Sequence, residues 1–168
     1  TGYTDLDRAI IGLTPGDMVV IGARPGMGKT SFAMNMATNV AKYHPDKTIC
    51  VFNLEMSKEQ LATRLLSTEA LVDSNKLRSG RLEKDEWLRL ASSADRLCHL
   101  NMYIDDTAAI TVQQMKAKLR RVKNLGLVVI DYLQLMTTTL KTDNRVAIIS
   151  EITRQLKIMA KELDVPII

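Results

Sequence analysis

A glycine-rich segment, GARPGMGKTSF at residues 22–32, has the residue types that bind a polyphosphate. It fits the phosphate-loop pattern G-x-x-x-x-G-K-[ST], except that Ala23 stands at the first glycine of the pattern. A methyl group there need not meet the phosphate, so the match is only slightly weakened. Lys29 would place its ammonium group between the β- and γ-phosphates, and the Thr30 hydroxyl would bind Mg²⁺. The pattern predicts a nucleotide site.

Backbone N–H groups would make most contacts of this loop. Gly26 and Gly28 allow the chain to turn back and come close to phosphate oxygens, at the positive end of the helix that follows. An ordinary glycine-rich turn would explain both glycines, but not the Lys29–Thr30 pair directly behind them. The predicted nucleotide-binding residues of the loop are Ala23, Arg24, Pro25, Gly26, Met27, Gly28, Lys29, Thr30 and Ser31.

Two carboxylates complete the candidate chemistry. Asp131 ends the apolar segment LVVID, where it would hold Mg²⁺ together with Thr30, although a strand-end aspartate can also cap a turn. Tyr132 follows it, so the catalytic base is not the adjacent residue. Glu55 ends another apolar segment and is our candidate for orienting and deprotonating the attacking water. Its alternative role is an acidic residue near the helix cap Ser57. We predict Lys29, Glu55 and Asp131 as the catalytic residues.

Alternating apolar and amphipathic segments must position these residues. Apolar runs predict strands, periodic runs predict helices, and the pairs Ser57/Gln60 and Thr111/Gln114 predict capping boxes. Strands that are apolar on both faces indicate a parallel sheet covered by helices on both faces, in one α/β domain. The expected strands are 17–23, 47–55, 102–106, 125–136 and a closing VPII, and the expected helices are 31–43, 57–71, 83–98, 111–123 and 145–163.

The composition is that of an ordinary globular domain. The 168 residues are 46% hydrophobic and 25% charged, and the net charge of +4 permits a polyanionic partner without requiring one. No apolar run approaches the roughly 20 residues of a membrane span, and no leader is evident, so we expect a cytoplasmic protein without a membrane partner. Cys50 and Cys98 are far apart in the sequence, and Cys50 is expected to be a buried thiol.

Four segments together resemble the RecA-like motor domain of the DnaB-type replicative DNA helicases. They are TGYTDLDRAIIGLTPGDMVVIGARPGMGKTSFAMNMA, VFNLEMSKEQLATRLL, LVVIDYLQLM and EITRQLKIMAKELDVPII, in the family's order from residue 1 to residue 168. The family carries ARP before its loop lysine, so Ala23 is its normal variant. The resemblance implies a RecA-like P-loop NTPase fold with a parallel sheet flanked by helices. It also implies one ATPase domain over residues 1–168 that is truncated at its C-terminal end.

The resemblance further implies ATP and Mg²⁺ as cofactors, and hydrolysis coupled to translocation on single-stranded DNA and unwinding of the duplex. The full-length protein would form a homohexamer and would work with a primase and a helicase loader. Lys29, Thr30, Glu55 and Asp131 match the family's phosphate lysine, magnesium threonine, catalytic glutamate and Walker B aspartate. The sensor glutamine, arginine finger and second DNA loop are expected beyond residue 168.

Three further residues match the family less specifically. Arg64 matches an arginine near the nucleotide, or is a solvated helix residue. The segment 136–146 corresponds to a loop that faces the channel, with Lys141 and Arg145 as candidate DNA phosphate contacts. This segment lacks aromatic residues, so it would follow backbone charge rather than stack on bases. An ordinary loop explains the segment equally well.

Other interpretations compete with the helicase. A related RecA-fold ATPase of the recombinase or clock type would share the loop and the sheet. A non-hydrolysing ATP switch, such as a loader or regulator, would not need Glu55. A GTPase is disfavoured because NKLR has Arg78 where guanine recognition needs aspartate. Basic residues between 116 and 123 are interpreted as a solvent or subunit face. Trp87 and the methionines at helical spacing are expected to be core residues.

Overall fold

The computed structural model describes residues 1–138 and 144–168, which form two compact units. The first unit contains Thr1–Glu55 and Asn101–Ile168, and the second contains Met56–Leu100. The expectation of one ATPase domain over the whole chain stays a prediction. No helix in the described part of the chain is long and apolar enough to cross a lipid bilayer.

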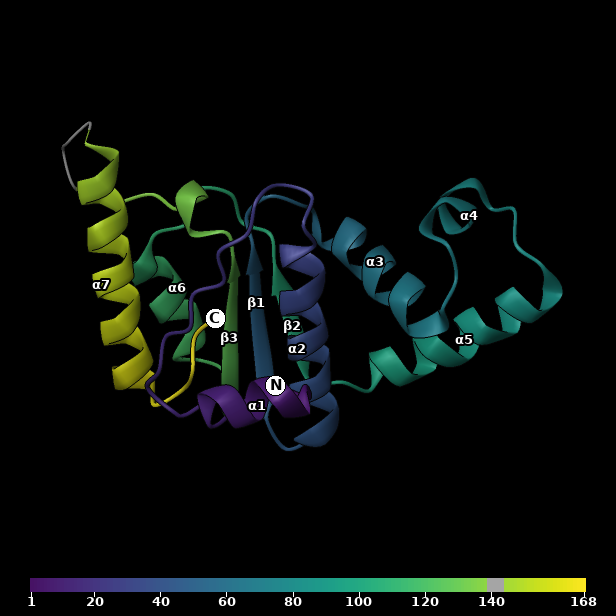
Figure 1. Ribbon diagram of the computed structural model, residues 1–168, viewed down its shortest axis with the longest axis horizontal. Coiled ribbons are helices and arrows are strands. Elements are labelled where there is room, and N and C mark those ends of the chain that lie inside the picture. Colours follow the sequence, from purple (N-terminus) through teal and green to yellow (C-terminus); the bar gives the residue numbers. More distant parts are fainter. Residues whose placement is uncertain (139–143) are drawn as a thin grey trace. The chain divides into compact units, whose positions relative to one another are not determined.

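A parallel sheet is the centre of the first unit (Figure 1). Its strands are β1 (Thr48–Asn53), β2 (Met102–Asp105) and β3 (Leu125–Asp131), in the order β2-β1-β3. Cys50 of β1 pairs with Tyr103 of β2 on one side and with Val128 of β3 on the other. All six residues of β1 are buried, which confirms a strand covered on both faces.

Two extended segments continue the pairing beyond β3 without forming strands. Ile167 bridges Val128 in parallel, and Met18 bridges Ile167. The Val19 N–H donates to the Ile167 carbonyl at 2.8 Å, but the next residue, Val20, is 61% exposed. The expected strand at 17–23 is therefore wrong in extent, because only Met18 is paired and the chain leaves the sheet after Val19. The closing VPII segment likewise contributes an isolated bridge rather than a strand.

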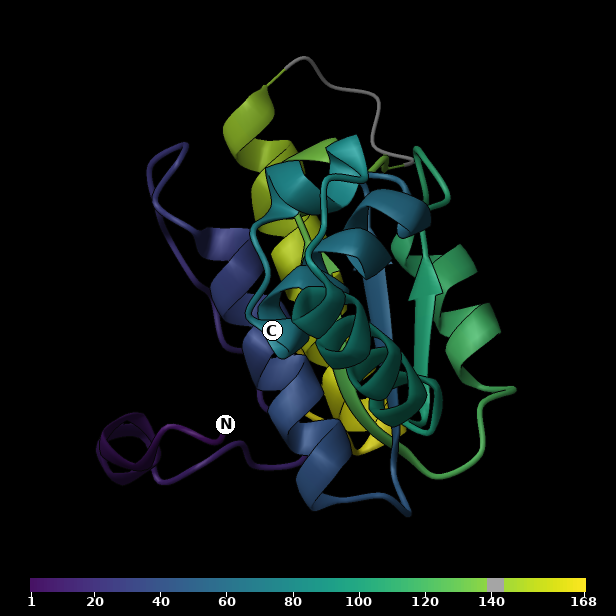
Figure 2. The ribbon, with the colours of Figure 1, turned by 90° about the vertical axis from the view of Figure 1, so that its right-hand side faces the viewer.

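Helices cover both faces of this sheet, as predicted. Figure 2 shows α2 (Lys29–Tyr43) and α6 (Val112–Leu119) on opposite sides of the strands. Side chains alternate along β1, so that Cys50 and Phe52 face α6 while Ile49 and Val51 point the other way, where α2 packs. A short helix that the sequence did not predict, α1 (Thr4–Ile10), precedes these elements.

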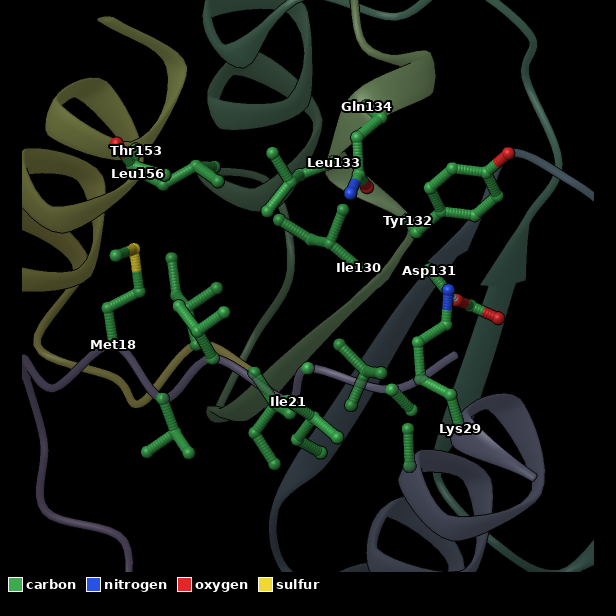
Figure 3. A pocket seen from close by; sticks show the side chains of 18 residues that line it. Met18, Ile21, Lys29, Ile130, Asp131, Tyr132, Leu133, Gln134, Thr153 and Leu156 are labelled. Atoms are coloured by element: carbon green, nitrogen blue, oxygen red, sulfur yellow. Dashed lines mark ion pairs between the residues drawn. The ribbon is translucent and has the colours of Figure 1, made fainter. Parts of the chain in front are cut away.

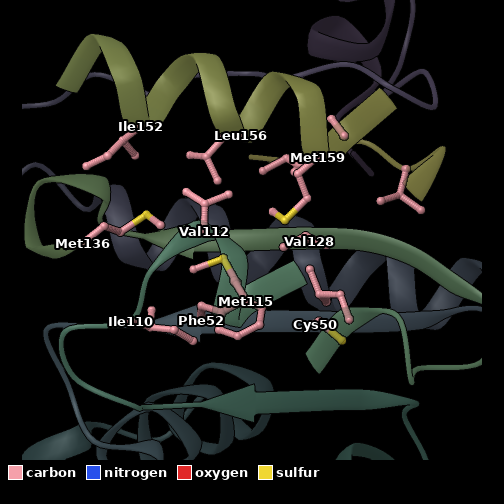
Figure 4. Close-up of a cluster of buried hydrophobic side chains, with 14 residues drawn as sticks. Cys50, Phe52, Ile110, Val112, Met115, Val128, Met136, Ile152, Leu156 and Met159 are labelled. Atoms are coloured by element: carbon pink, nitrogen blue, oxygen red, sulfur yellow. The ribbon is translucent and has the colours of Figure 1, made fainter. Parts of the chain in front are cut away.

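On the face of the sheet that α6 covers, the hydrophobic core is formed with α6 and α7 (Arg145–Leu163) (Figure 4). Ile152, Leu156 and Met159 of α7 form the predicted apolar stripe and are at most 3% exposed. They pack with the buried Val128 and Met115 in one cluster. The structure therefore confirms the periodicity of residues 145–163 as a helix that covers the sheet.

Polar contacts fix the ends of these helices. Thr111 caps α6 through the predicted capping box with Gln114, and the Asn144 side chain accepts from the N–H groups of Val146 and Ala147 at the start of α7. Strand β3 is shorter than the expected 125–136, because a 3-10 turn, η1 (Leu133–Leu135), follows Asp131. In the basic run on α6, Lys116 pairs with Glu162 and Lys118 pairs with Asp105.

The second unit is a small helical cluster. It contains α3 (Lys58–Ala70), α4 (Ser74–Ser79), which was not predicted, and α5 (Lys84–Cys98). Helices α3 and α5 pack together, and Ser57 and Gln60 form the predicted capping box. Trp87 is 57% exposed, so its expected place in the core is wrong. The buried stripe of α5 runs through Glu86, Leu90 and Ser93, and Trp87 lies about 100° away from it around the helix.

A buried carboxylate links α4 to α5. Glu86 is 7% exposed, and its Oε1 lies 2.9 Å from the Lys76 Nζ. Its Oε2 accepts the Glu83 N–H at 2.9 Å, which completes the cap of α5. The hydrogen bond from Glu83 and the Lys76 ammonium group together hold the pKa of Glu86 below its ordinary value of 4.5.

This lowered pKa predicts acid sensitivity of the second unit. Stability from the Glu86 charge is complete above pH 4.5, the ordinary value, and is lost as the pH falls through the lower folded-state pKa. We expect Glu86→Gln to reduce the free energy of unfolding, and we expect the difference from wild type to shrink below pH 4.5. Urea unfolding of both proteins from about pH 6 to about pH 3 measures this difference. A difference that is constant over the range would contradict it.

Candidate nucleotide site

The loop before α2 has the backbone conformation that its glycines predict. Gly26 and Gly28 have φ angles of 79° and 84°, in the left-handed region. A Cβ at either position would meet nothing within 4 Å, so the φ angle rather than space requires glycine here. The Met27 N–H donates to the Arg24 carbonyl at 3.2 Å and closes the turn.

Helix α2 begins at Lys29 with Gly28 as its N-cap, and no described side chain caps it. The first N–H groups of a helix need partners from outside the helix, and together with the helix dipole they favour an anion. Residues Ala23 to Gly28 and Ser31 are exposed, so a ligand can reach this end of the helix. The geometry suits a phosphate group.

Asp131, at the end of β3, meets the start of α2. It is 4% exposed, its Oδ1 lies 2.9 Å from the Lys29 Nζ, and its Oδ2 accepts the Thr30 hydroxyl at 2.5 Å. Figure 3 shows the Lys29 side chain extending toward Asp131. The fold thus brings the predicted site residues Lys29 and Thr30 together with Asp131, which lies about 100 positions further along the sequence.

The same contacts fit a magnesium ion. Thr30 and Asp131 supply a hydroxyl and a carboxylate whose oxygens already lie within hydrogen-bonding distance of each other. Oxygen ligands of this kind suit Mg²⁺, which usually takes one or two protein ligands beside phosphate oxygens and water. Metal binding by Thr30 and Asp131 nevertheless stays a prediction.

Tyr132 is a member of this cluster that the sequence does not predict. The Lys29 Nζ lies 4.1 Å from the centroid of the Tyr132 ring, within the range of a cation–π contact. In the sequence, Tyr132 indicates only that glutamate does not follow Asp131. No spacing rule in the sequence indicates that an aromatic ring here would reach the loop lysine.

A cavity of about 220 Å³ opens beside this cluster (Figure 3). Its walls are mainly apolar and come from residues 18–23, the end of β3, residues 132–134 and α7, with Lys29 and Asp131 as the charged pair. Of the predicted phosphate-loop residues, only Ala23 and Lys29 line it. The exposed loop and the start of α2, rather than this cavity, are therefore the candidate phosphate site.

Glu55 lies at the same end of the sheet as Asp131. Asn53 of β1 pairs with Asp131 of β3, and the Leu54 N–H donates to the Asp131 carbonyl at 2.7 Å. The Glu55 N–H donates to the Asn53 Oδ1 at 3.1 Å, and the Glu55 side chain is exposed. Its position agrees with the expected convergence of strand ends, while its role as a base stays a prediction.

The remaining predicted residues lie elsewhere. Arg64 belongs to α3 of the second unit, so its predicted nucleotide contact stays a prediction. Lys141 lies outside the described residues. Arg145 is exposed and is the first residue of α7, while Met136, at the other end of the expected channel loop, is buried in the core. The DNA contacts of Lys141 and Arg145 stay predictions.

Comparison with known proteins identifies the family. Residues 1–168 match the model of the DnaB-like helicase C terminal domain. The chain belongs to this family. It is 47% identical to a protein of Trieres chinensis named "Probable replicative DNA helicase" and 45% identical to the "Replicative DNA helicase DnaB" of a Synechocystis strain. Both matches cover 100% of the chain, which spans only 38% and 20% of the lengths of these relatives.

Solved structures confirm the RecA-like ATPase fold. The chain superposes on one solved ATPase domain with a TM-score of 0.92 at 35% identity, over 99% of this chain and 60% of that one. It matches a DnaB-like replicative helicase, from a study of its interactions with primase, with a TM-score of 0.91 at 34% identity. That match covers 99% of this chain and 42% of the other.

The ion pair at the start of α2 predicts the outcome of removing its cation. We predict that Lys29→Ala abolishes ATP hydrolysis by the full-length protein, because it removes the charge that is expected to meet the γ-phosphate, where negative charge develops in the reaction. The matched control is Lys42→Ala, near the other end of α2, which should hydrolyse ATP at about the wild-type rate. Phosphate release measures both rates, and circular dichroism confirms folding. Near-normal turnover by Lys29→Ala would refute the site.

Proposed function

We propose that this chain is the nucleotide-binding part of an ATP-driven replicative DNA helicase. The observation that carries the proposal is the contact of Lys29 and Thr30 with the buried Asp131, in a chain of the DnaB-like helicase family. The motor would couple ATP hydrolysis to translocation on single-stranded DNA and to separation of the duplex. A recombinase or clock-type ATPase is disfavoured by the family match over residues 1–168.

Each residue has a distinct role in this proposal. The N–H groups at the start of α2 hold the phosphates, and the Lys29 ammonium group neutralises charge on the γ-phosphate. Thr30 and Asp131 hold Mg²⁺, which when bound neutralises charge on the β- and γ-phosphates. Glu55 orients the attacking water and accepts its proton on the carboxylate. Arg64 supplies a further positive charge to the nucleotide.

The partners of the whole protein are part of the same proposal. We infer that it forms a homohexamer around single-stranded DNA, with Lys141 and Arg145 at the phosphate backbone in the channel. We also infer a primase and a helicase loader as partners, and a structural relative was studied for its interactions with primase. The cytoplasmic location stays a prediction.

Unwinding by the full-length protein tests this function. We expect hydrolysis that single-stranded DNA stimulates, together with Mg·ATP-dependent strand separation on a forked duplex with one labelled strand. The control is a duplex without single-stranded tails. A ring that encircles one strand cannot load onto it, so its strands should stay paired. Hydrolysis that DNA does not change, without strand separation, would exclude the helicase and favour another RecA-fold ATPase.

Replacing the candidate base separates a motor from a non-hydrolysing switch. Glu55→Gln keeps the shape of the side chain but cannot accept a proton, so turnover should fall by about a hundredfold or more while Mg·ATP affinity stays near wild type. Glu59→Gln, on the exposed first turn of α3, is the matched control and should leave both unchanged. Single-turnover hydrolysis and nucleotide titration measure the two quantities. An unchanged rate in Glu55→Gln would assign the base to another residue.

A further inference from the structure

We propose that Tyr132 is a positioning residue for Lys29: the face of its ring holds the lysine ammonium group at the phosphate site. This inference rests on the proposed nucleotide site and deepens it. It assigns the contact between ring and cation a role in nucleotide binding, beyond the roles already given to Lys29 and Asp131.

The geometry places the lysine charge between two partners. The Lys29 Nζ is 2.9 Å from the Asp131 Oδ1 and 4.1 Å from the centroid of the Tyr132 ring. The Lys29 side chain is 27% exposed, so water screens it only in part. A cation over an aromatic face is attracted by the negative face of the ring, and this attraction strengthens as the cation loses water.

Only one of these partners can stay when Mg·ATP binds. Asp131 is assigned to Mg²⁺ in the proposed function, and Lys29 to the phosphates, so the ion pair between them must weaken. The ring attracts the positive charge without accepting any of the three N–H donors through oxygen or nitrogen. The donors that point away from the ring remain available to phosphate oxygens while the ring keeps the ammonium group in place.

A lysine side chain benefits from such support because it is flexible. A flexible stem of four carbons connects the ammonium group to the backbone, and fixing the rotation about its bonds opposes ligand binding. A group that is already held in its bound position avoids part of this cost. The contact is made by the ring face rather than by the hydroxyl group, so phenylalanine should replace tyrosine with little loss.

Fluorination of the ring tests this role without changing its shape. Tyr132→Phe and phenylalanines with one, two, three and five fluorines are introduced at position 132 of the full-length protein. Affinity for Mg·AMP-PNP, a non-hydrolysable ATP analogue, is measured by calorimetry. Fluorine withdraws charge from the ring face, so affinity should fall stepwise with each addition. We expect Tyr132→Phe to remain within about twofold of wild type, and Tyr132→Leu to bind about three- to tenfold more weakly.

The control is the same series at Tyr43, the last residue of α2, which is 70% exposed. Affinity there should not depend on fluorination. Equal affinity across the series at position 132 would overturn the proposal and make Tyr132 a packing residue. The fluorinated series tests the proposal even if Tyr132→Leu does not fold, because every ring in the series has nearly the same shape. Absence of Mg·AMP-PNP binding by the wild-type protein would instead refute the nucleotide site itself.

Discussion

The carboxylate of Asp131 is almost fully buried, and a buried charge must be compensated by an opposite charge and hydrogen bonds. Lys29 supplies the charge and Thr30 supplies a hydroxyl donor. Both residues belong to the first turn of α2, so this one requirement ties the phosphate loop to the end of the central sheet. The glycine turn before α2, in turn, sets the direction in which the helix enters.

This compensation also determines what a nucleotide has to change. Each oxygen of Asp131 already has a partner, and those partners are the groups assigned to phosphate and metal. In the proposed function, binding of Mg·ATP exchanges these contacts within the protein for contacts with the ligand. The net affinity reflects the difference between the two sets, so groups such as the Tyr132 ring, which can keep their contact through the exchange, gain importance.

Local signals in the sequence were enough to predict much of the fold. The capping residues Ser57 and Thr111 fixed helix starts, and the apolar stripe of 145–163 identified α7, because these effects act within a few residues. The segment 17–23 was misjudged because strand formation depends on distant partners, which here pair only Met18. Trp87 was predicted to be buried because, in the sequence, a large apolar residue beside the buried face of a helix looks like a residue on that face.

In the candidate site, too, the residues that belong to short motifs were predictable from the sequence, whereas a contact between distant residues was not. The loop pattern predicted Lys29 and Thr30, and the strand end predicted Asp131, since each lies within a short motif. The contact of Tyr132 with Lys29 joins residues about 100 positions apart and follows no spacing rule, so only the folded chain reveals it. Motifs therefore identify the groups that do chemistry more readily than the groups that hold them in place.

Backbone contacts also fix the position of Glu55, the proposed base. It ends the first of the two segments that make up the first unit, and the helical second unit begins at the next residue, Met56. Two hydrogen bonds anchor this end of β1: the Leu54 N–H to the Asp131 carbonyl, and the Glu55 N–H to the buried Asn53 side chain. The backbone of the proposed base is therefore fixed to the strand that carries the proposed metal ligand. Its distance from Asp131 depends on the sheet and not on the placement of the second unit.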